Sequence, residues 1–327
     1  MFAARCCLAA SFAAACLMMS ASPARAGAYP ERPVRLIVPF PAGSSIDTAA
    51  RVLARNLAPA LGETVFVENK PGAGGTVGAV AAARAAPDGY SIMLGSVAQL
   101  IGKAVQPGVA FDPVKDFVPV SLAYRTAAIL TVSSQSSVKS AGDLVRWAKD
   151  RPGVLNYYSG GVGTAAHLLG ATFSTKEGIS TLHVPVRTVT DMLPMLEDGV
   201  PHFAFFIAPA VQPYVESNRF RALAVSSRER MPQLRVVPTL FELFHDEDLV
   251  QESWLGIWAP AGTPAPVVRK LFDATAHAVN SPEFRTAMER QSQQAVASRS
   301  PEEFAAYVRA ENGKWERLVK AAQMQKE

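Results

Sequence analysis

Two loops rich in glycine and hydroxyl side chains are the strongest candidates for a binding site in this sequence. The first, 39–47 (P-F-P-A-G-S-S-I-D), follows the predicted strand 34–38, which is mostly apolar, and the second, 159–164 (S-G-G-V-G-T), follows the predicted strand 155–158. Each stands where a predicted strand ends and a predicted helix begins. The first N–H groups of a helix have no partner within the helix, and the helix dipole is positive there, so each loop is a candidate anion site. The alternative for each loop is a capped turn without a ligand.

Strands and helices that alternate along the chain must position these loops. This order predicts an α/β fold with a mainly parallel sheet, whose ligands bind at the carboxyl ends of the strands. Two loops of the same kind, one in each half of the chain, favour a ligand held in a cleft. The expected strands are 34–38, 64–68, 91–95, the long extended segment 118–133, 155–158, 181–184, 203–207, 221–226 and 254–259; the expected helices are 46–61, 76–86, 141–150, 164–175, 189–196, 210–216, 264–280, 282–291 and 301–324.

The chain of 327 residues is long for a single core, so two domains are expected. An extended segment as long as 118–133 exceeds an ordinary strand and can run from one domain into the other. The C-terminal tail holds only helices and should pack back on the first α/β unit. We therefore predict a discontinuous domain 1, made of 27–124 and 253–327, and a domain 2 of 125–252.

Other motifs argue against nucleotide binding, metal binding and catalysis. The loop 72–78 has the spacing G-x-G-x-x-x-G, one residue too long for a dinucleotide loop, and no Gly-Lys-Ser/Thr occurs. Ser159 lacks the G-x-S-x-G frame, because Tyr157 stands in place of the first glycine. The five histidines show no metal-ligand spacing. His167 is expected to be a buried or interdomain histidine, with ligand contact as the alternative.

The first 26 residues have the features of a secretory signal peptide. An apolar stretch, 6–19, is too short to span a bilayer and precedes the A-x-A cleavage pattern at Ala24–Ala26. Lipid attachment at Cys16 is the alternative to cleavage after Ala26. The three cysteines all lie in this segment, so the mature chain has no disulfide. Its removal lowers the net charge from +4 to +2, and no basic run suggests a nucleic-acid partner. We expect a soluble periplasmic protein.

Seven segments together resemble the Bug family, the TctC-type receptors of tripartite tricarboxylate transporters. They cover the mature chain in order, at 33–47, 67–75, 85–90, 111–122, 161–168, 221–227 and 259–268. The resemblance implies a fold like that of type II periplasmic binding proteins, with two α/β domains that close on a ligand. It also implies a small organic acid held by backbone amides of the loops 40–45 and 159–165, and permease subunits in the membrane as partners.

The sequence departs from the family pattern at three places that affect the ligand. Ala42-Gly43-Ser44 replaces the usual P-G-G, and Pro185-Val186-Arg187-Thr188 replaces the usual P-Y-K-G. Phe206 stands where the family often has a ligand-side aspartate. Because this change leaves the second wall more apolar and less able to hold an ammonium group, we expect a carboxylate with an apolar or aromatic body.

The predicted ligand site combines backbone donors, hydroxyl groups, two aromatic rings and one cation. Arg187 is the charged candidate, as a bidentate donor to a carboxylate, although a solvated arginine is equally compatible with the sequence. The candidate residues are Phe40, Ala42, Gly43, Ser44, Ser45, Ser96, Ser159, Gly163, Thr164, Ala165, Arg187 and Phe206.

The sequence therefore predicts a monomeric solute-binding protein, without cofactor or metal, that delivers a small carboxylate to a transporter. A receptor that feeds a signalling system would have the same features. An exported enzyme acting on small acids is the third alternative, for which the sequence shows neither a nucleophile–base pair nor a metal set.

Overall fold

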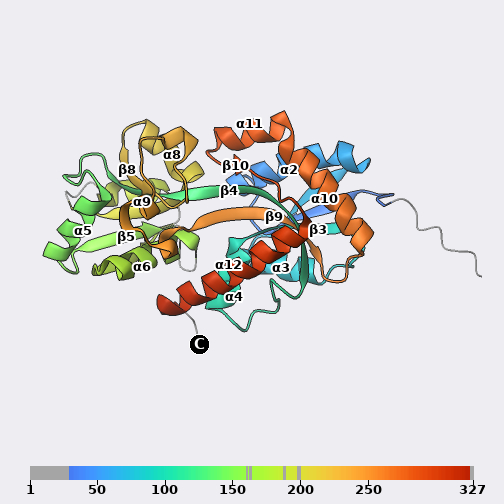
Figure 1. Cartoon of the computed structure of the whole chain (residues 1–327), viewed down its shortest axis with the longest axis horizontal. Helices are drawn as coiled ribbons and strands as arrows, with labels where there is room; N and C mark the ends of the chain where they lie inside the picture. Colours follow the sequence, from blue (N-terminus) through green and yellow to red (C-terminus); the bar gives the residue numbers. More distant parts are fainter. Residues whose placement is uncertain (1–28, 160, 162–163, 187–188, 197–199, 325–327) are drawn as a thin grey trace, which may run out of the picture.

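The computed structural model describes residues 29–159, 161, 164–186, 189–196 and 200–324. The predicted signal peptide and Cys16 lie outside this part of the chain. Two α/β lobes lie at opposite ends of the molecule, and the long strands β4 and β9 run side by side between them (Figure 1). Within the described residues, no helix has the length and apolarity needed to cross a membrane.

The first lobe is built on the parallel strands β2, β1 and β3, with β9 antiparallel beside β3. Neighbouring residues of β1 point to opposite faces, as strand geometry requires. Leu36 joins a core with α2 and α10, whereas Ile37 joins a core with α3, α4 and α12. The elements are β1 (Val34–Val38), α2 (Ser45–Leu61), β2 (Val65–Asn69), α3 (Thr76–Ala83), β3 (Ser91–Ser96), α4 (Val97–Val105) and β9 (Glu252–Pro260).

Strand β4 (Phe117–Ser133) connects the two lobes in a single run of 17 residues. Its first part, as far as Ala127, pairs with β9, whereas from Ala128 onward it pairs with β7 and β8. The prediction of one long extended segment is confirmed. The change of partner after Ala127 supports a boundary near the predicted one, and the exact domain limits remain a prediction.

The second lobe packs its core around aromatic rings. Phe173 of α6 meets Phe203 and Phe205 of β7 edge to face, in the arrangement that ring quadrupoles favour. Strand β5 lies between β7 and β6 and is parallel to both. The elements are α5 (Ala141–Asp150), β5 (Leu155–Ser159), α6 (Ala165–Glu177), β6 (Thr181–Pro185), α7 (Val189–Met192), β7 (Phe203–Ile207), α8 (Ala208–Glu216), β8 (Phe220–Val225) and α9 (Leu240–Phe244).

The helical tail returns to the first lobe, as predicted. Helix α10 packs on α2, and α12 packs on α4 and β4. Two of the three tail helices begin with proline, where the missing N–H costs nothing. The elements are α10 (Ala265–Asn280), α11 (Pro282–Arg290), the short strand β10 (Gln294–Ala295) beside β4, and α12 (Pro301–Ala321).

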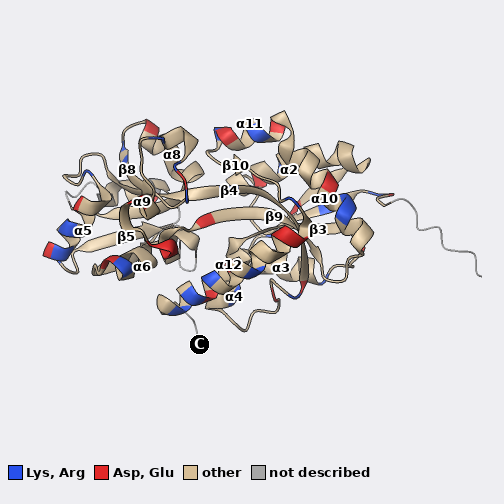
Figure 2. Ribbon diagram, viewed as in Figure 1, with Lys and Arg blue, Asp and Glu red and all other residues tan. Residues whose placement is uncertain are grey.

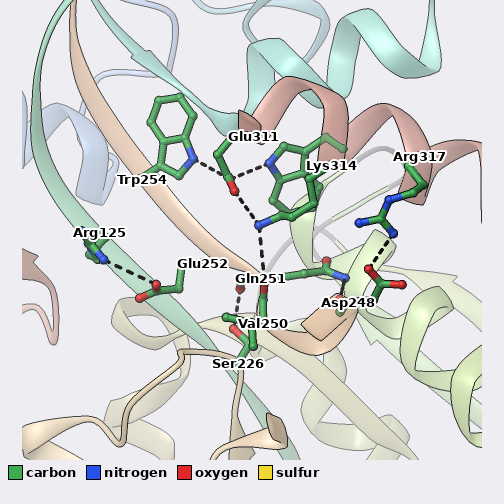
Figure 3. Close-up of polar contacts among 11 residues, drawn as sticks. Arg125, Ser226, Asp248, Val250, Gln251, Glu252, Trp254, Glu311, Lys314 and Arg317 are labelled. Carbon is green, nitrogen blue, oxygen red and sulfur yellow. Dashed lines mark hydrogen bonds and ion pairs between the residues drawn. The ribbon is translucent and has the colours of Figure 1, made fainter. Parts of the chain in front are cut away.

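Helix α12 also fixes the start of β9 (Figure 3). The carboxylate of Glu311 accepts hydrogen bonds from the indole N–H groups of Trp254 and Trp315, both at 2.9 Å, and from Lys314 Nζ at 2.6 Å. One turn further on, Arg317 donates to Asp248 at 2.6 Å. Residues of α12 therefore hold both β9 and the segment that leads into it.

Helix α4 was not predicted, although the sequence carries its start signal. Ser96 caps the helix and Gln99 reaches back to the Ser96 backbone, which is the capping box S-x-x-Q before an apolar run. The short helix α9 and the two-residue strand β10 were not predicted either, and the other departures are mainly shifts of a few residues at the ends of the elements.

Candidate functional site

A cavity of about 530 Å³ lies between the two lobes. It is bounded by the carboxyl ends of β1 and β3, the N-termini of α4 and α6, the end of β7 and the two long strands. None of the residues described along its wall is charged, and the charged residues visible in Figure 2 lie largely on outer helices such as α5, α10, α11 and α12. Its wall includes Phe40, Ile46, Ser96, Val97, Ala98, Tyr124, Thr126, Thr164, Ala165, Ala166, Phe206, Ile207, Ser253, Trp254, Leu255 and Gln293.

The N-terminus of α6 opens into this cavity. Thr164 caps the helix: its Oγ1 accepts from His167 N at 3.2 Å, and its hydroxyl donates to Gly161 O at 2.8 Å. The N–H groups of Ala165 and Ala166 donate to no acceptor within the described residues, and both residues line the cavity. Because α6 has 13 residues, the positive end of a full helix dipole lies at this part of the wall, together with two N–H groups that have no acceptor among the described residues.

The N-terminus of α4 contributes the second polar edge of the cavity. Ser96 accepts from Ala98 N at 3.2 Å, while its own N–H and hydroxyl donate to Gln99 Oε1 at 2.7 and 2.9 Å. Gly75, with a φ of 98°, leaves room for the Gln99 amide, because a Cβ there would lie 2.6 Å from Nε2. Ser96 is thus held in one orientation at the end of β3.

The N-terminus of α2 is arranged differently. Asp47 is 3% exposed and accepts from Gly43 N at 2.9 Å, Arg51 Nε at 3.0 Å and Asn69 Nδ2 at 2.9 Å. Burial by itself would raise the pKa of Asp47, but hydrogen bonds from Arg51, Gly43 and Asn69 outweigh it and lower the pKa below its ordinary value. A carboxylate of the protein itself therefore occupies this helix end.

The predicted site residues are only partly brought together. Phe40, Ser96, Thr164, Ala165 and Phe206 line the cavity. Ala42, Gly43, Ser44 and Ser45 lie outside its wall, and the Gly43 N–H, expected to face a ligand, donates to Asp47. Gly163 and Arg187 fall outside the described residues.

Ser159, also predicted to line the site, is fully buried beside two histidines instead. Its Oγ lies 2.8 Å from His183 Nε2, and the His183 ring stacks on that of His167 at 3.7 Å. Burial, together with the neighbouring His183, lowers the pKa of His167 to about 4. The prediction of a buried histidine is confirmed for His167. The Ser159–His183 contact was not predicted, because it depends on the pairing of β5 with β6.

Sequence reasoning also missed polar residues of the wall, above all Tyr124 on the long strand β4 and Gln293 just before the short strand β10. Nothing in their local sequence marks them, since their places on the wall depend on how β4, β9 and β10 pair. Among the described residues, no group of three or more His, Cys, Asp or Glu side chains could hold a metal ion.

Comparisons with known proteins agree with this architecture. Residues 49–324 match the family model TctC, described as "Tripartite tricarboxylate transporter family receptor". Protein BugT of Bordetella pertussis is 35% identical over 250 residues, 76% of each chain. The solved structure of the periplasmic binding protein BugD is similar with a TM-score of 0.77 and 31% identity, covering 91% of this chain and 100% of that one. The structure of an R. palustris protein with adipate has a TM-score of 0.77 and 30% identity, and the match covers 90% of this chain and 98% of that one.

These likenesses extend over both lobes, so they confirm the predicted two-domain periplasmic binding protein fold and the family to which the sequence motifs pointed. The matched structures are those of binding proteins. The chain belongs to the TctC family, the receptors of tripartite tricarboxylate transporters.

Proposed function

We propose that this protein is a periplasmic receptor that binds a small organic carboxylate in the cavity between its lobes. The observation that carries the proposal is the N-terminus of α6, where Ala165 and Ala166 line the cavity, their N–H groups have no acceptor within the described part of the chain, and no described residue of the wall is charged. Two converging backbone donors at the positive end of a helix favour a carboxylate without a cation. The R. palustris relative solved with adipate supports this class of ligand.

The walls select the body of the ligand. Phe40 and Phe206 line the cavity from opposite lobes, and Val97, Ile207 and Leu255 add further apolar surface. An ammonium group would find no carboxylate among the described residues of the wall. The ligand is therefore a carboxylate with an apolar or aromatic body in preference to an amino acid. A contribution from Gly43, Ser44 and Ser45 rests on the sequence resemblance alone.

Delivery of the ligand to membrane permease subunits follows from the family. The closed form, with ligand between the lobes, is the form that docks on the permease. Export rests on the predicted signal peptide, and it is checked by sequencing the N-terminus of the mature protein recovered from the periplasm. A mature chain that begins at Gly27 is expected; an unprocessed chain, or one lipidated at Cys16, would contradict the predicted cleavage.

A thermal-shift screen of the chain from Gly27 tests the ligand class. Each carboxylate is compared with the amide of the same acid, which has the same body but no charge. A carboxylate at 100 times its dissociation constant should stabilise the fold by about 2.7 kcal/mol, whereas its amide should give no shift. Equal shifts from acid and amide, or no shift from any carboxylate, would contradict the proposal.

A further inference from the structure

The cavity between the lobes continues from the N-terminus of α4 along one side of that helix. Ala98, Gly102, Val105 and Gln106 all line it. Their spacing, i, i+4, i+7 and i+8, puts them on one face of the helix. Because a helix rises by about 1.5 Å per residue, the face from Ala98 to Gln106 is about 12 Å long. One side of α4 is therefore cavity wall over most of its length.

The cavity side of α4 is accessible, unlike the side that packs in the core. Leu100 and Ile101 are fully buried, in the core that α4 shares with α12. Ala98 and Gly102 are only half-buried, and Gln106 is exposed. A molecule in the cavity can therefore reach this face of the helix and remove its small apolar residues from water.

Gly102 lies in the middle of this face, and neither its backbone nor its described surroundings require a glycine. It continues the helix, with its carbonyl accepting from Gln106 N at 2.9 Å, and a Cβ built on it would meet no described atom within 4 Å. Gly78 of α3 is the contrast, because a Cβ there would lie 2.7 Å from the Cβ of Pro39. A glycine inside a helix also destabilises it. The missing side chain at Gly102 leaves open space at the cavity wall.

The segment before α3 and the start of α6 lie close to α4 and line the same cavity. They contribute Ala73, Gly74, Thr76, Thr164 and Ala165. Because one cavity joins the N-terminus of α6 to the face of α4, a ligand whose carboxylate binds at α6 has room for its body along α4. The cavity volume of about 530 Å³ is within the range of clefts that bind drug-sized ligands, about 300–1,000 Å³.

We propose that the face of α4 from Ala98 to Gln106 binds an extended apolar body of the ligand, and that Gly102 determines how large a body the cavity accepts. The ligand class is then a carboxylate with an apolar chain or ring system that reaches from the N-terminus of α6 past the first turn of α4. This inference rests on the proposed function, because it specifies the ligand of the same cavity.

Calorimetric titration of the chain from Gly27 with hexanoate, octanoate and decanoate tests the inference. In the wild type, decanoate should bind about tenfold to a hundredfold more tightly than hexanoate, because the added methylene groups leave water for the face of α4. Gly102→Leu fills the space at the wall and should reduce this ratio of affinities to about threefold or less. Gly102→Ala adds a single methyl group and should reduce the ratio by a smaller factor.

Gly313→Leu is the matched control. Gly313 lies inside α12, is exposed, and a Cβ there would also meet no described atom within 4 Å, but it is not on the described cavity wall. Both leucine variants remove a glycine from a helix and should raise the urea midpoint, whereas only Gly102→Leu should lower the ratio. If decanoate binds no more tightly than hexanoate, if Gly102→Leu keeps the ratio, or if both leucine variants lower it alike, the inference is wrong and carboxylate binding stands. If no acid of the series binds, both the inference and the proposed function are wrong.

Discussion

The N-termini of α2 and α6 have the same local design and opposite surroundings. Each follows a strand of the parallel type and is capped by a hydroxyl, that of Ser44 or Thr164, which accepts the N–H three residues later at 3.2 Å. The cap residues even share extended backbone angles, φ −69° and ψ 162° against φ −78° and ψ 158°. What differs is the third helical residue, which is Asp47 in α2 and His167 in α6.

This single position decides whether the helix end remains available to an anion. Asp47 places a carboxylate of the protein at the positive end of α2, where Gly43, Arg51 and Asn69 hold it. His167 turns away to stack on His183, and burial keeps it neutral at pH 7. No carboxylate of the described residues therefore accepts from the first N–H groups of α6, and both of the residues that carry them line the cavity. The loop before α2 therefore has a structural role, whereas the loop before α6 belongs to the proposed binding site.

The largest change in ligand affinity is expected when His167 of α6 is replaced by aspartate, the residue at the same helical position in α2. In His167→Asp, the new carboxylate lies at the third helical position and competes with the ligand for the free N–H groups. The affinity for carboxylates should fall at least about a hundredfold, close to 3 kcal/mol, as calorimetry would show. The control His167→Asn has a similar size and no charge, and should lose less than about tenfold. Equal losses in the two variants would mean that charge at this position is not what keeps the site open.

The sequence predicted the common design of the two loops but not this difference. Strand runs such as 34–38, the proline and glycine breaks and the cap residues are local signals, and the structure confirms the elements they predicted. Asp47 belongs to the first of these loops and its residue type suits a helix cap, yet its actual role depends on Asn69, which lies at the end of the next strand, β2. The contact of Ser159 with His183 was not predicted for a similar reason, because it depends on the pairing of β5 with β6.

The second effect concerns stability and belongs to α2. Asp47→Asn removes the charge that receives hydrogen bonds from Gly43, Arg51 and Asn69. Because hydrogen bonds to a charged group contribute more than neutral ones, the free energy of unfolding in urea should fall by about 2 kcal/mol. The ligand affinity should hardly change, since Asp47 is not on the cavity wall. A loss of affinity without a loss of stability would show instead that the α2 loop binds the ligand.

A smaller effect is expected from the deletion of one N–H group in each helix. Ala165→Pro and Ser45→Pro both place proline at the first helical position, which tolerates it, after a residue that is already extended. Ala165→Pro should weaken carboxylate binding about tenfold, because one donor of the anion site is lost. Ser45→Pro makes the same backbone change at the occupied helix end and should bind normally. Calorimetry gives the dissociation constant of each variant. If both constants rose by the same factor, the proposed difference between the N-termini of α2 and α6 would be wrong.

The smallest effect is the contribution of His167 to the pH dependence of the free energy of unfolding. Its folded pKa of about 4 lies below the ordinary histidine value of about 6.5, so the unfolded chain binds a proton that the folded chain does not. Its contribution to stability is therefore complete above about pH 6.5 and is lost as the pH falls toward 4. Urea unfolding should give a free energy about 1 kcal/mol lower at pH 5.5 than at pH 7 from this residue alone. The pKa of His183 is lowered in the same direction by burial, so the effect of His167 is the difference between the wild type and His167→Asn. If the two proteins show the same pH dependence, His167 is not held neutral by the fold, and the open end of α6 must have another cause.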